Sequence, residues 1–299
     1  MQDYFYGWYL KCQSREQTLA LIPAIHQNGG KRTCSIQIIT EEFTEEVTYP
    51  SYVYRQTGRF GTVLKPVHGQ AIVIGENVFC EKGMRLAIHR PDCMMEGVIH
   101  FKQLTPLKYD MMGPFALVPF MECRHSVYSM QHTVNGKVFL NGKRYEFCNA
   151  DGYWEGDRGT SFPKEYLWTQ CHFDGGSLML SVADIPMCGG NFTGVIGVVY
   201  WQNREYRFAT YLGAGVCLLG NGGVCIEQGD MRLEAKLVTW SPEQGKTKAK
   251  GLRAPVLGEM SRTIHENVAC HATYHFRKGE EVELHFETER AAFEYEFEH

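Results

Sequence analysis

The strongest constraint on the fold of this chain is an internal repeat. Residues 9–24 align without a gap with residues 168–183. The identical pairs in this alignment are Cys12 and Cys171, Leu19 and Leu178, Leu21 and Leu180, and Ala24 and Ala183. Further along, Ile36-Gln-Ile-Ile39 and Ile196-Gly-Val-Val199 follow in the same order in the two halves. Self-similarity in a constant order predicts a tandem duplication, and we place the two domains at residues 1–148 and 149–299.

Both halves have the pattern of antiparallel β-structure. Apolar and polar residues alternate in Val282-Glu-Leu-His-Phe-Glu and in Phe293-Glu-Tyr-Glu-Phe-Glu, as in a strand with one buried face. Asn-Gly pairs at 135–136, 141–142 and 221–222 are typical of tight hairpin turns. We therefore predict an all-β chain of two barrels or sandwiches. A barrel of about eight strands can hold one small hydrophobic ligand.

The composition argues against several classes of function. A net charge of −4 over 299 residues provides no basic surface for nucleic acid. The N-terminus does not have the order of a signal peptide, and no apolar run reaches the ~18 residues of a transmembrane helix. Eleven cysteines without a Cys-x-x-Cys pair indicate reduced thiols and a cytoplasmic protein. Because phosphate-binding glycine loops and zinc-ligand spacings are missing from the sequence, we expect no cofactor and no metal.

The segment 151–168 at the middle of the chain has an unusual composition. It places Glu155, Asp157 and Arg158 within four residues and surrounds them with aromatic side chains. Its glycines and a proline predict an ordered loop that leads into a strand. We assign this loop to the C-terminal domain.

The run Gly152-Tyr-Trp-Glu-Gly-Asp-Arg-Gly-Thr-Ser-Phe-Pro-Lys-Glu-Tyr-Leu-Trp-Thr-Gln170 resembles the signature segment of the tocopherol cyclase-like family. Leu252-Arg-Ala-Pro-Val-Leu-Gly-Glu-Met260 is similar to the second segment of that family, and Phe5-Tyr-Gly-Trp-Tyr9 to its opening. Pro119-Phe-Met-Glu-Cys-Arg-His125 resembles bacterial members. The resemblance implies two lipocalin-like β-barrels in tandem. It also implies cofactor-independent cyclisation of a prenylated hydroquinone to a chromanol.

The chain departs from the plant-type cyclases inside the signature segment. Glu155 matches the family, whereas Asp157 and Arg158 stand where Asn and Trp are expected. The departure leaves the substrate open. Three classes of function remain: a lyase or isomerase that cyclises or hydrates a hydrophobic prenylated or aromatic molecule, a carrier of such a molecule, and an enzyme for a more polar phenolic or sugar-like substrate.

Glu155 is the candidate acid for this chemistry. Addition to an isolated alkene needs a proton delivered to carbon by a carboxylic acid in a dry apolar pocket, and aromatic faces can stabilise the resulting cation. Asp157 is then a second acid or the partner of Arg158. The alternative is that the three charges form a structural ion pair and do no chemistry. The candidate substrate-binding residues are Tyr153, Trp154, Phe162, Trp168, His125 and Trp8. Trp8 and Trp168 are equally expected to pack at the barrel floors.

Overall fold

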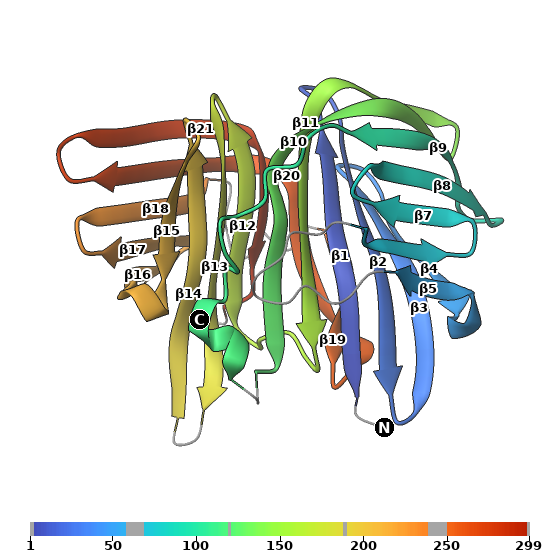
Figure 1. The fold of residues 1–299 in the computed structure, drawn as a ribbon, viewed down its shortest axis with the longest axis horizontal. Helices are drawn as coiled ribbons and strands as arrows, with labels where there is room; N and C mark the ends of the chain where they lie inside the picture. Colours follow the sequence, from blue (N-terminus) through green and yellow to red (C-terminus); the bar gives the residue numbers. More distant parts are fainter. Residues whose placement is uncertain (1–2, 58–68, 119–120, 188–189, 239–249, 298–299) are drawn as a thin grey trace. The chain divides into compact units, whose positions relative to one another are not determined.

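Most of the described chain is antiparallel β-strand, which confirms the predicted all-β class (Figure 1). The structure is a computed structural model that describes residues 3–57, 69–118, 121–187, 190–238 and 250–297. Within these ranges the helical elements are three 3-10 turns, η1 (Ser51–Val53), η2 (Gly113–Leu117) and η3 (Thr210–Leu212). No helix in the described part of the chain is long and apolar enough to cross a membrane.

The first sheet has 11 strands and packs around the first hydrophobic core. In sheet order its strands are β4 (Thr44–Pro50), β3 (Lys31–Thr40), β2 (Thr18–Asn28), β1 (Tyr4–Gln13), β11 (Lys143–Gly159), β10 (Cys123–Leu140), β9 (Met94–Phe101), β8 (Gly83–His89), β7 (Asn77–Cys80), β6 (Ala71–Ile74) and β5 (Tyr54–Thr57). Alternate residues of these strands form the core, among them Trp8 and Leu10 of β1 and Trp154 of β11.

The second sheet repeats this arrangement around a second core. In sheet order its strands are β15 (Arg204–Ala209), β14 (Gly190–Trp201), β13 (Gly176–Met187), β12 (Tyr166–Phe173), β21 (Val282–Tyr295), β20 (Glu259–Lys278), β18 (Met231–Leu237), β17 (Gly223–Gln228) and β16 (Gly215–Gly220), and β19 (Lys250–Val256) pairs with β20. In each sheet the first strand in the chain pairs with a late one, β1 with β11 and β12 with β21. The matching order is what the duplication predicts.

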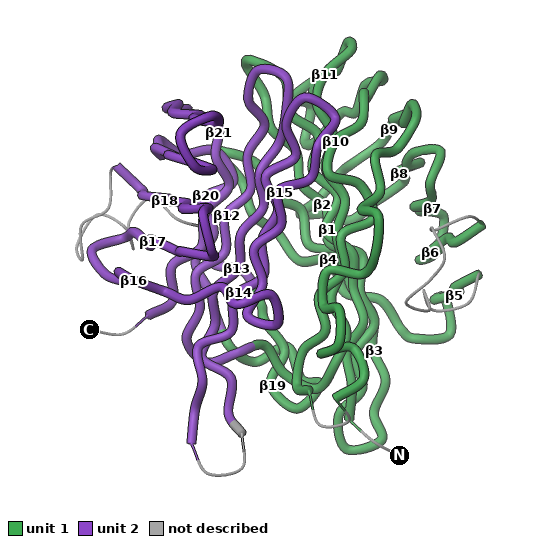
Figure 2. The backbone as a smooth tube through the Cα atoms, turned by 60° about the vertical axis from the view of Figure 1, so that its left-hand side comes forward, with its two compact units in different colours: residues 1–162, 253–262 green, residues 163–252, 263–299 purple. Residues whose placement is uncertain are grey.

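The chain divides into two compact units at residues that differ from the predicted boundary (Figure 2). The first unit contains residues 1–162 and 253–262, and the second contains 163–252 and 263–299. The boundary lies beyond 148 because β11 continues to Gly159 and is paired on one side with β1 and on the other with β10. The first unit therefore holds the charged part of the segment 151–168.

The predicted loop at the start of that segment is wrong, because residues 151–159 belong to strand β11. The glycines that suggested a loop serve side-chain packing. A Cβ on Gly152 would lie 2.4 Å from Nε2 of His132, and one on Gly156 would lie 2.8 Å from Cδ1 of Trp8. Glycine thus lets two rings lie directly over the strand on either side of Trp154.

The two segments that resemble the tocopherol cyclase-like family meet inside the first unit. The N–H of Phe162 donates to the carbonyl of Pro255 at 3.1 Å, and the N–H of Gly258 donates to the carbonyl of Thr160 at 2.7 Å. The N–H of Leu257 donates to Oγ of Ser161 at 2.9 Å. These hydrogen bonds explain why 253–262 belongs to the first unit although it follows most of the second in sequence.

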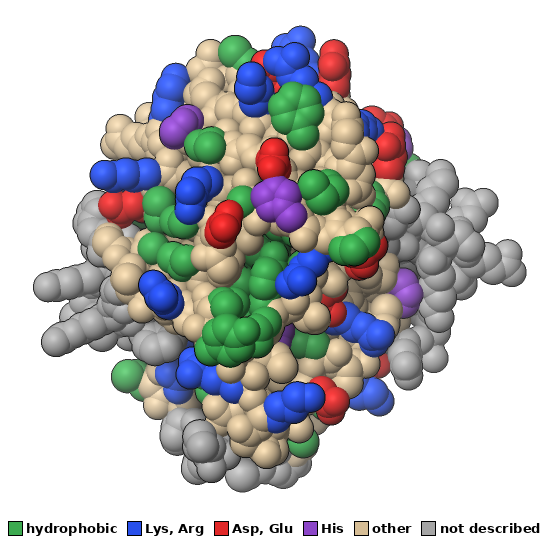
Figure 3. All heavy atoms as spheres, turned by 90° about the vertical axis from the view of Figure 1, so that its right-hand side faces the viewer, with side chains coloured by type: hydrophobic (Ala, Val, Ile, Leu, Met, Phe, Trp, Pro, Cys, Tyr) green, Lys and Arg blue, Asp and Glu red, His purple; other side chains and the backbone are tan. Residues whose placement is uncertain are grey.

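Charges of both signs are interspersed on the face of the first unit that Figure 3 draws. Exposed ion pairs of this unit include Lys143 with Glu42 at 2.7 Å and Arg144 with Glu146 at 2.6 Å. Exposed pairs of this kind contribute little to stability. The stability of the unit therefore depends on its core and on the packing over β11.

We expect Gly156→Ala to destabilise the protein by about 1–3 kcal/mol, because the new methyl group overpacks against Trp8 and against the carbonyl oxygen of Gly7, 2.8 Å away. Urea denaturation measures the free energy of unfolding. The matched control is Gly215→Ala, where a Cβ meets nothing within 4 Å and the change should stay within about 0.5 kcal/mol. Equal effects of the two substitutions would contradict the packing role of Gly156.

Candidate active site

Strand β11 presents two chemically different faces. Trp154 points into the first core, so Tyr153, Glu155 and Asp157 lie on the opposite face of the sheet, since neighbours in a strand alternate. His125 of β10 is directly opposite Asp157 in the register, and residues paired in this way share a face. The first sheet thus gathers two acids, a tyrosine and a histidine on the side away from its core.

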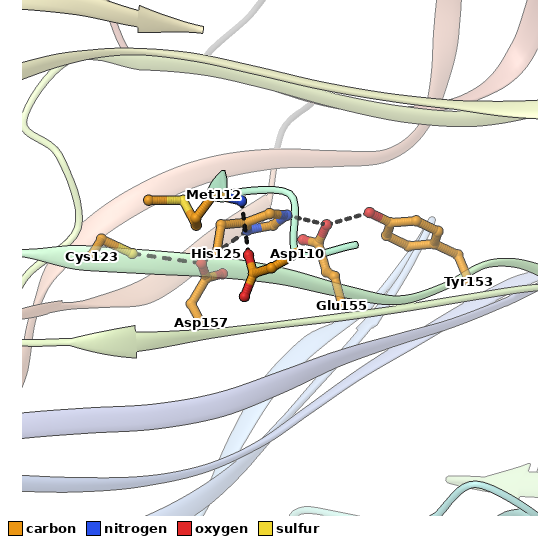
Figure 4. Close-up of polar contacts among 7 residues, drawn as sticks. All are labelled: Asp110, Met112, Cys123, His125, Tyr153, Glu155 and Asp157. Atoms are coloured by element: carbon orange, nitrogen blue, oxygen red, sulfur yellow. Dashed lines mark hydrogen bonds and ion pairs between the residues drawn. The ribbon is translucent and has the colours of Figure 1, made fainter. Parts of the chain in front are cut away.

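The His125 ring bridges the two carboxylates (Figure 4). Its Nδ1 lies 2.9 Å from Oδ1 of Asp157, and its Nε2 lies 3.1 Å from Oε2 of Glu155. The first contact has hydrogen-bond geometry. The second has the distance of an ion pair without the alignment of a hydrogen bond.

Two further groups extend the row at both ends. The hydroxyl of Tyr153 donates to Oε2 of Glu155 at 2.5 Å, and the thiol of Cys123 donates to Oδ1 of Asp157 at 3.5 Å. The polar chain therefore runs from Tyr153 through Glu155, His125 and Asp157 to Cys123. We call these five residues the polar row.

The polar row is largely shielded from water. Tyr153 is fully buried, and only 4% of the surface of Glu155 and 9% of that of His125 is exposed to solvent. Burial alone would lower the pKa of His125, but the adjacent carboxylates of Glu155 and Asp157 outweigh it and raise this pKa well above the usual 6.5. An imidazolium between two carboxylates is thereby favoured, as buried charges require partners.

Burial and Glu155 act together on Tyr153. Burial raises the pKa of the phenol, and the nearby carboxylate of Glu155 raises it further. Tyr153 therefore stays protonated and donates. The thiol of Cys123 behaves alike, because burial and then the charge of Asp157 raise its pKa well above the usual value. Neither group is a nucleophile at neutral pH.

Strand β1 adds a buried lysine to the same face. Lys11 is fully buried and is opposite Tyr153 in the register, and Tyr9 is opposite Glu155. Sequence reasoning missed Lys11 and Cys123. The pairing of β1 with β11 brings in residues about 140 positions away in the chain, and no local motif signals such a contact.

The trio His125, Glu155 and Asp157 also has metal-ligand composition, with one ligand atom from each within 4.8 Å of the others. A metal ion takes one ring nitrogen and leaves the other to an outer partner. Here the two ring nitrogens contact different carboxylates, so the three groups do not converge on one point as they stand.

Arg158 lies on the other face of β11. It has the same parity as Trp154, which belongs to the first core. Burial raises the pKa of Tyr6 and of Tyr128, and the charge of Arg158 offsets part of this rise. The three predicted catalytic residues are therefore divided, with Glu155 and Asp157 joined by His125 and with Arg158 beside the tyrosines.

Aromatic rings pack closely on this core face. Trp154 makes ring contacts with Trp8 at 4.8 Å and with Tyr128 at 5.0 Å between centroids. The indole nitrogen of Trp8 donates to the hydroxyl of Tyr6 at 2.6 Å. Trp8 thus packs within the first core.

The other two predicted binding residues, Phe162 and Trp168, lie outside the strands β10 and β11 that carry the polar row. Phe162 packs edge-on against Phe5 in the first unit, with 5.4 Å between ring centroids. Trp168 belongs to β12 of the second unit. Its neighbour Leu167 points into the second core, so Trp168 faces the other side of that sheet and does not form a barrel floor.

No family model matches the chain. A chloroplastic protein of Oryza sativa subsp. japonica described as "Probable tocopherol cyclase" is 28% identical over 109 residues, which are 34% of this chain and 23% of that protein. The similarity is therefore partial in both chains.

Two solved structures share the fold over nearly the whole chain. Kievitone hydratase from Nectria haematococca has a TM-score of 0.52 at 9% identity, covering 98% of this chain and 89% of its own. CghA bound to Sch210972 has a TM-score of 0.61 at 9% identity, covering 98% of this chain and 88% of its own. At such identities the likeness concerns the fold.

We expect the two buried histidines of β10 to affect stability in opposite ways as pH changes. His125 has a raised folded pKa, so its contribution is fully present below the unfolded pKa of about 6.5 and is lost as pH rises through the folded value. The pKa of His132 is lowered by burial to about 3, so its contribution falls as pH drops below about 6.5.

Urea denaturation between pH 5 and about pH 9 tests this opposite pH dependence with one variant of each histidine. His125→Gln should lower the free energy of unfolding by about 3–5 kcal/mol, as expected for a broken buried pair. This loss should be greatest at the acidic end and shrink as pH rises. The loss caused by His132→Gln should shrink in the opposite direction, towards pH 5. Parallel pH profiles would disprove the assignment of charge to His125.

Proposed function

We propose that the protein is a cofactor-independent hydratase or cyclase that adds an oxygen–hydrogen bond across the alkene of a hydrophobic, prenylated or aromatic small molecule. The observation that carries the proposal is the His125 ring held between the partly exposed carboxylate of Asp157, 2.9 Å away, and the buried carboxylate of Glu155, 3.1 Å away. Such a row stores one proton between two bases and can both release and recover it. An addition to an alkene requires this, because the proton given at the start must be returned to the catalyst at the end.

The reaction begins with a proton on the His125–Glu155 pair. The proton goes to the less substituted alkene carbon, and the π electrons form the new C–H bond. The adjacent carbon becomes a tertiary cation. A substrate phenol oxygen, in a cyclisation, or water, in a hydration, gives an electron pair to form the C–O bond. The proton of that hydroxyl returns to the His125–Glu155 pair.

Asp157 and Tyr153 hold the other members in place. Asp157 accepts from Nδ1 of His125, which directs the second ring proton at Nε2 towards Glu155. Tyr153 donates to Oε2 of Glu155 and thereby fixes the orientation of the carboxyl group. Asp157 and Tyr153 are positioning residues, while Glu155 takes the Nε2 proton of His125 and delivers it to the alkene carbon.

The partial similarity to a protein named as a tocopherol cyclase and the shared fold with a protein named as a hydratase support this reaction class. Both names describe additions of oxygen to carbon or ring closures that need no redox step. The polar row supports the same class through its chemistry alone.

The experiment incubates the purified protein in D2O with a prenylated hydroquinone, from which both a chromanol and a hydrated alcohol can form. We expect product with one deuterium bound to carbon, detected by mass spectrometry, because the proton comes from a solvent-exchanged group. Glu155→Gln and His125→Gln should reduce the rate at least about 100-fold, the usual contribution of general acid catalysis.

The matched control is Glu146→Gln, an exposed acid on the same strand β11, which should retain full activity. Full activity of a folded Glu155→Gln variant, checked by circular dichroism, would overturn the proposal. Tight binding of the hydroquinone without turnover by the wild-type protein would instead identify a carrier.

A further inference from the structure

A second group of ligand-type side chains lies in the second unit, on the hairpin of β16 and β17. Cys217, Cys225 and Glu227 each place one ligand atom within 4.8 Å of the others. None of these residues belongs to the polar row. Their chemistry therefore stands independently of the proposed function.

The strand pattern directs all three groups away from the second core. Ile226 points into that core, so its neighbours Cys225 and Glu227 lie on the outer face of β17. Leu218 is opposite Cys225, and the register shifts between Val216 and Leu218.

This shift makes Cys217 the extra residue of a β-bulge. In a bulge two residues of one strand face a single residue of the other, so both approach the same partner side chain. Here Cys217 joins Leu218 over Cys225. Cys217 is exposed while Cys225 is buried, so one thiol is open to solvent and the other lies beneath it.

The surrounding charges favour a cation. Glu234 of β18 is directly opposite Cys225 in the register. The single guanidinium of Arg232 contacts Glu227 at 2.6 Å and Glu234 at 2.9 Å. Two carboxylates thus surround one positive charge beside the two thiols, and the local charge is negative before either thiol ionises.

We propose that Cys217, Cys225 and Glu227 form a binding site for a thiophilic divalent cation such as Zn²⁺. Two thiolates and a carboxylate are a zinc-type donor set. Zinc at about 2.3 Å from sulfur and 2.0–2.2 Å from oxygen fits between atoms that lie within 4.8 Å of one another. Three protein ligands leave the fourth tetrahedral position to water.

The sequence predicted no metal, because it has no closely spaced Cys-x-x-Cys pair. The two thiols are brought together by the hairpin instead, across the turn of Gly220 and Gly223. Pairing across a turn produces ligand spacings that the usual zinc motifs do not cover.

The test titrates the full-length protein with Co²⁺ and then Zn²⁺ under a phosphine reductant, which keeps the thiols reduced. We expect a sulfur-to-cobalt charge-transfer band that saturates at one equivalent and disappears when Zn²⁺ is added. Absence of the band in fully reduced protein would overturn the proposal. It would do so even if the two thiols were found to form a disulfide once the reductant is removed.

Variants assign the ligands. Cys217→Ser removes an exposed thiol and should abolish the band, while Cys148→Ser, at another exposed cysteine, should leave it unchanged. Glu227→Gln removes a carboxylate ligand and should weaken cobalt affinity by at least about 10-fold, because the loss of even an outer-shell partner costs about that much. Arg232→Gln should tighten binding, because it removes the competing cation from Glu227. A band of wild-type intensity in Cys217→Ser would disprove the site.

Discussion

The pairing of β11 with both β1 and β10 is the constraint on which the first unit depends. Because the strand is hydrogen-bonded on both sides, its side chains can leave only towards the two faces of the sheet. The core face takes Trp154 together with glycines that admit neighbouring rings. The other face takes Glu155 and Asp157. One strand therefore supplies both the packing of the unit and its candidate chemistry.

The polar row is stable because its charges compensate one another. A buried carboxylate or imidazolium alone would be costly. Here His125 lies between two acids, and Tyr153 and Cys123 donate to those acids from the two ends. In the proposed reaction a proton moves within the row while the charge of the group as a whole stays constant. Structural stability and the proposed proton transfer thus require the same contacts.

The all-β class and the duplicated order of strands could be predicted from the sequence. Both depend on patterns visible in the sequence itself, the alternation of apolar and polar residues and the repeat between the two halves. Sequence reasoning also selected Glu155 and Asp157 as the unusual acids. It misassigned the conformation around them, since it took Gly152 and Gly156 as loop formers. In the structure the glycines make room for the rings of His132 and Trp8. A glycine in a sequence can mark either a turn or a close packing contact, and the local sequence does not distinguish the two.

The sequence by itself determined which residues could carry charge, which could pack, and that two similar β units follow one another. The tertiary structure decided the partners. It separated Arg158 from Asp157 by strand alternation, and it joined His125 to both acids through the register of β10 and β11. It likewise placed Cys217 over Cys225 through a bulge. Cross-strand register depends on the whole sheet, and therefore no local run of residues specifies it.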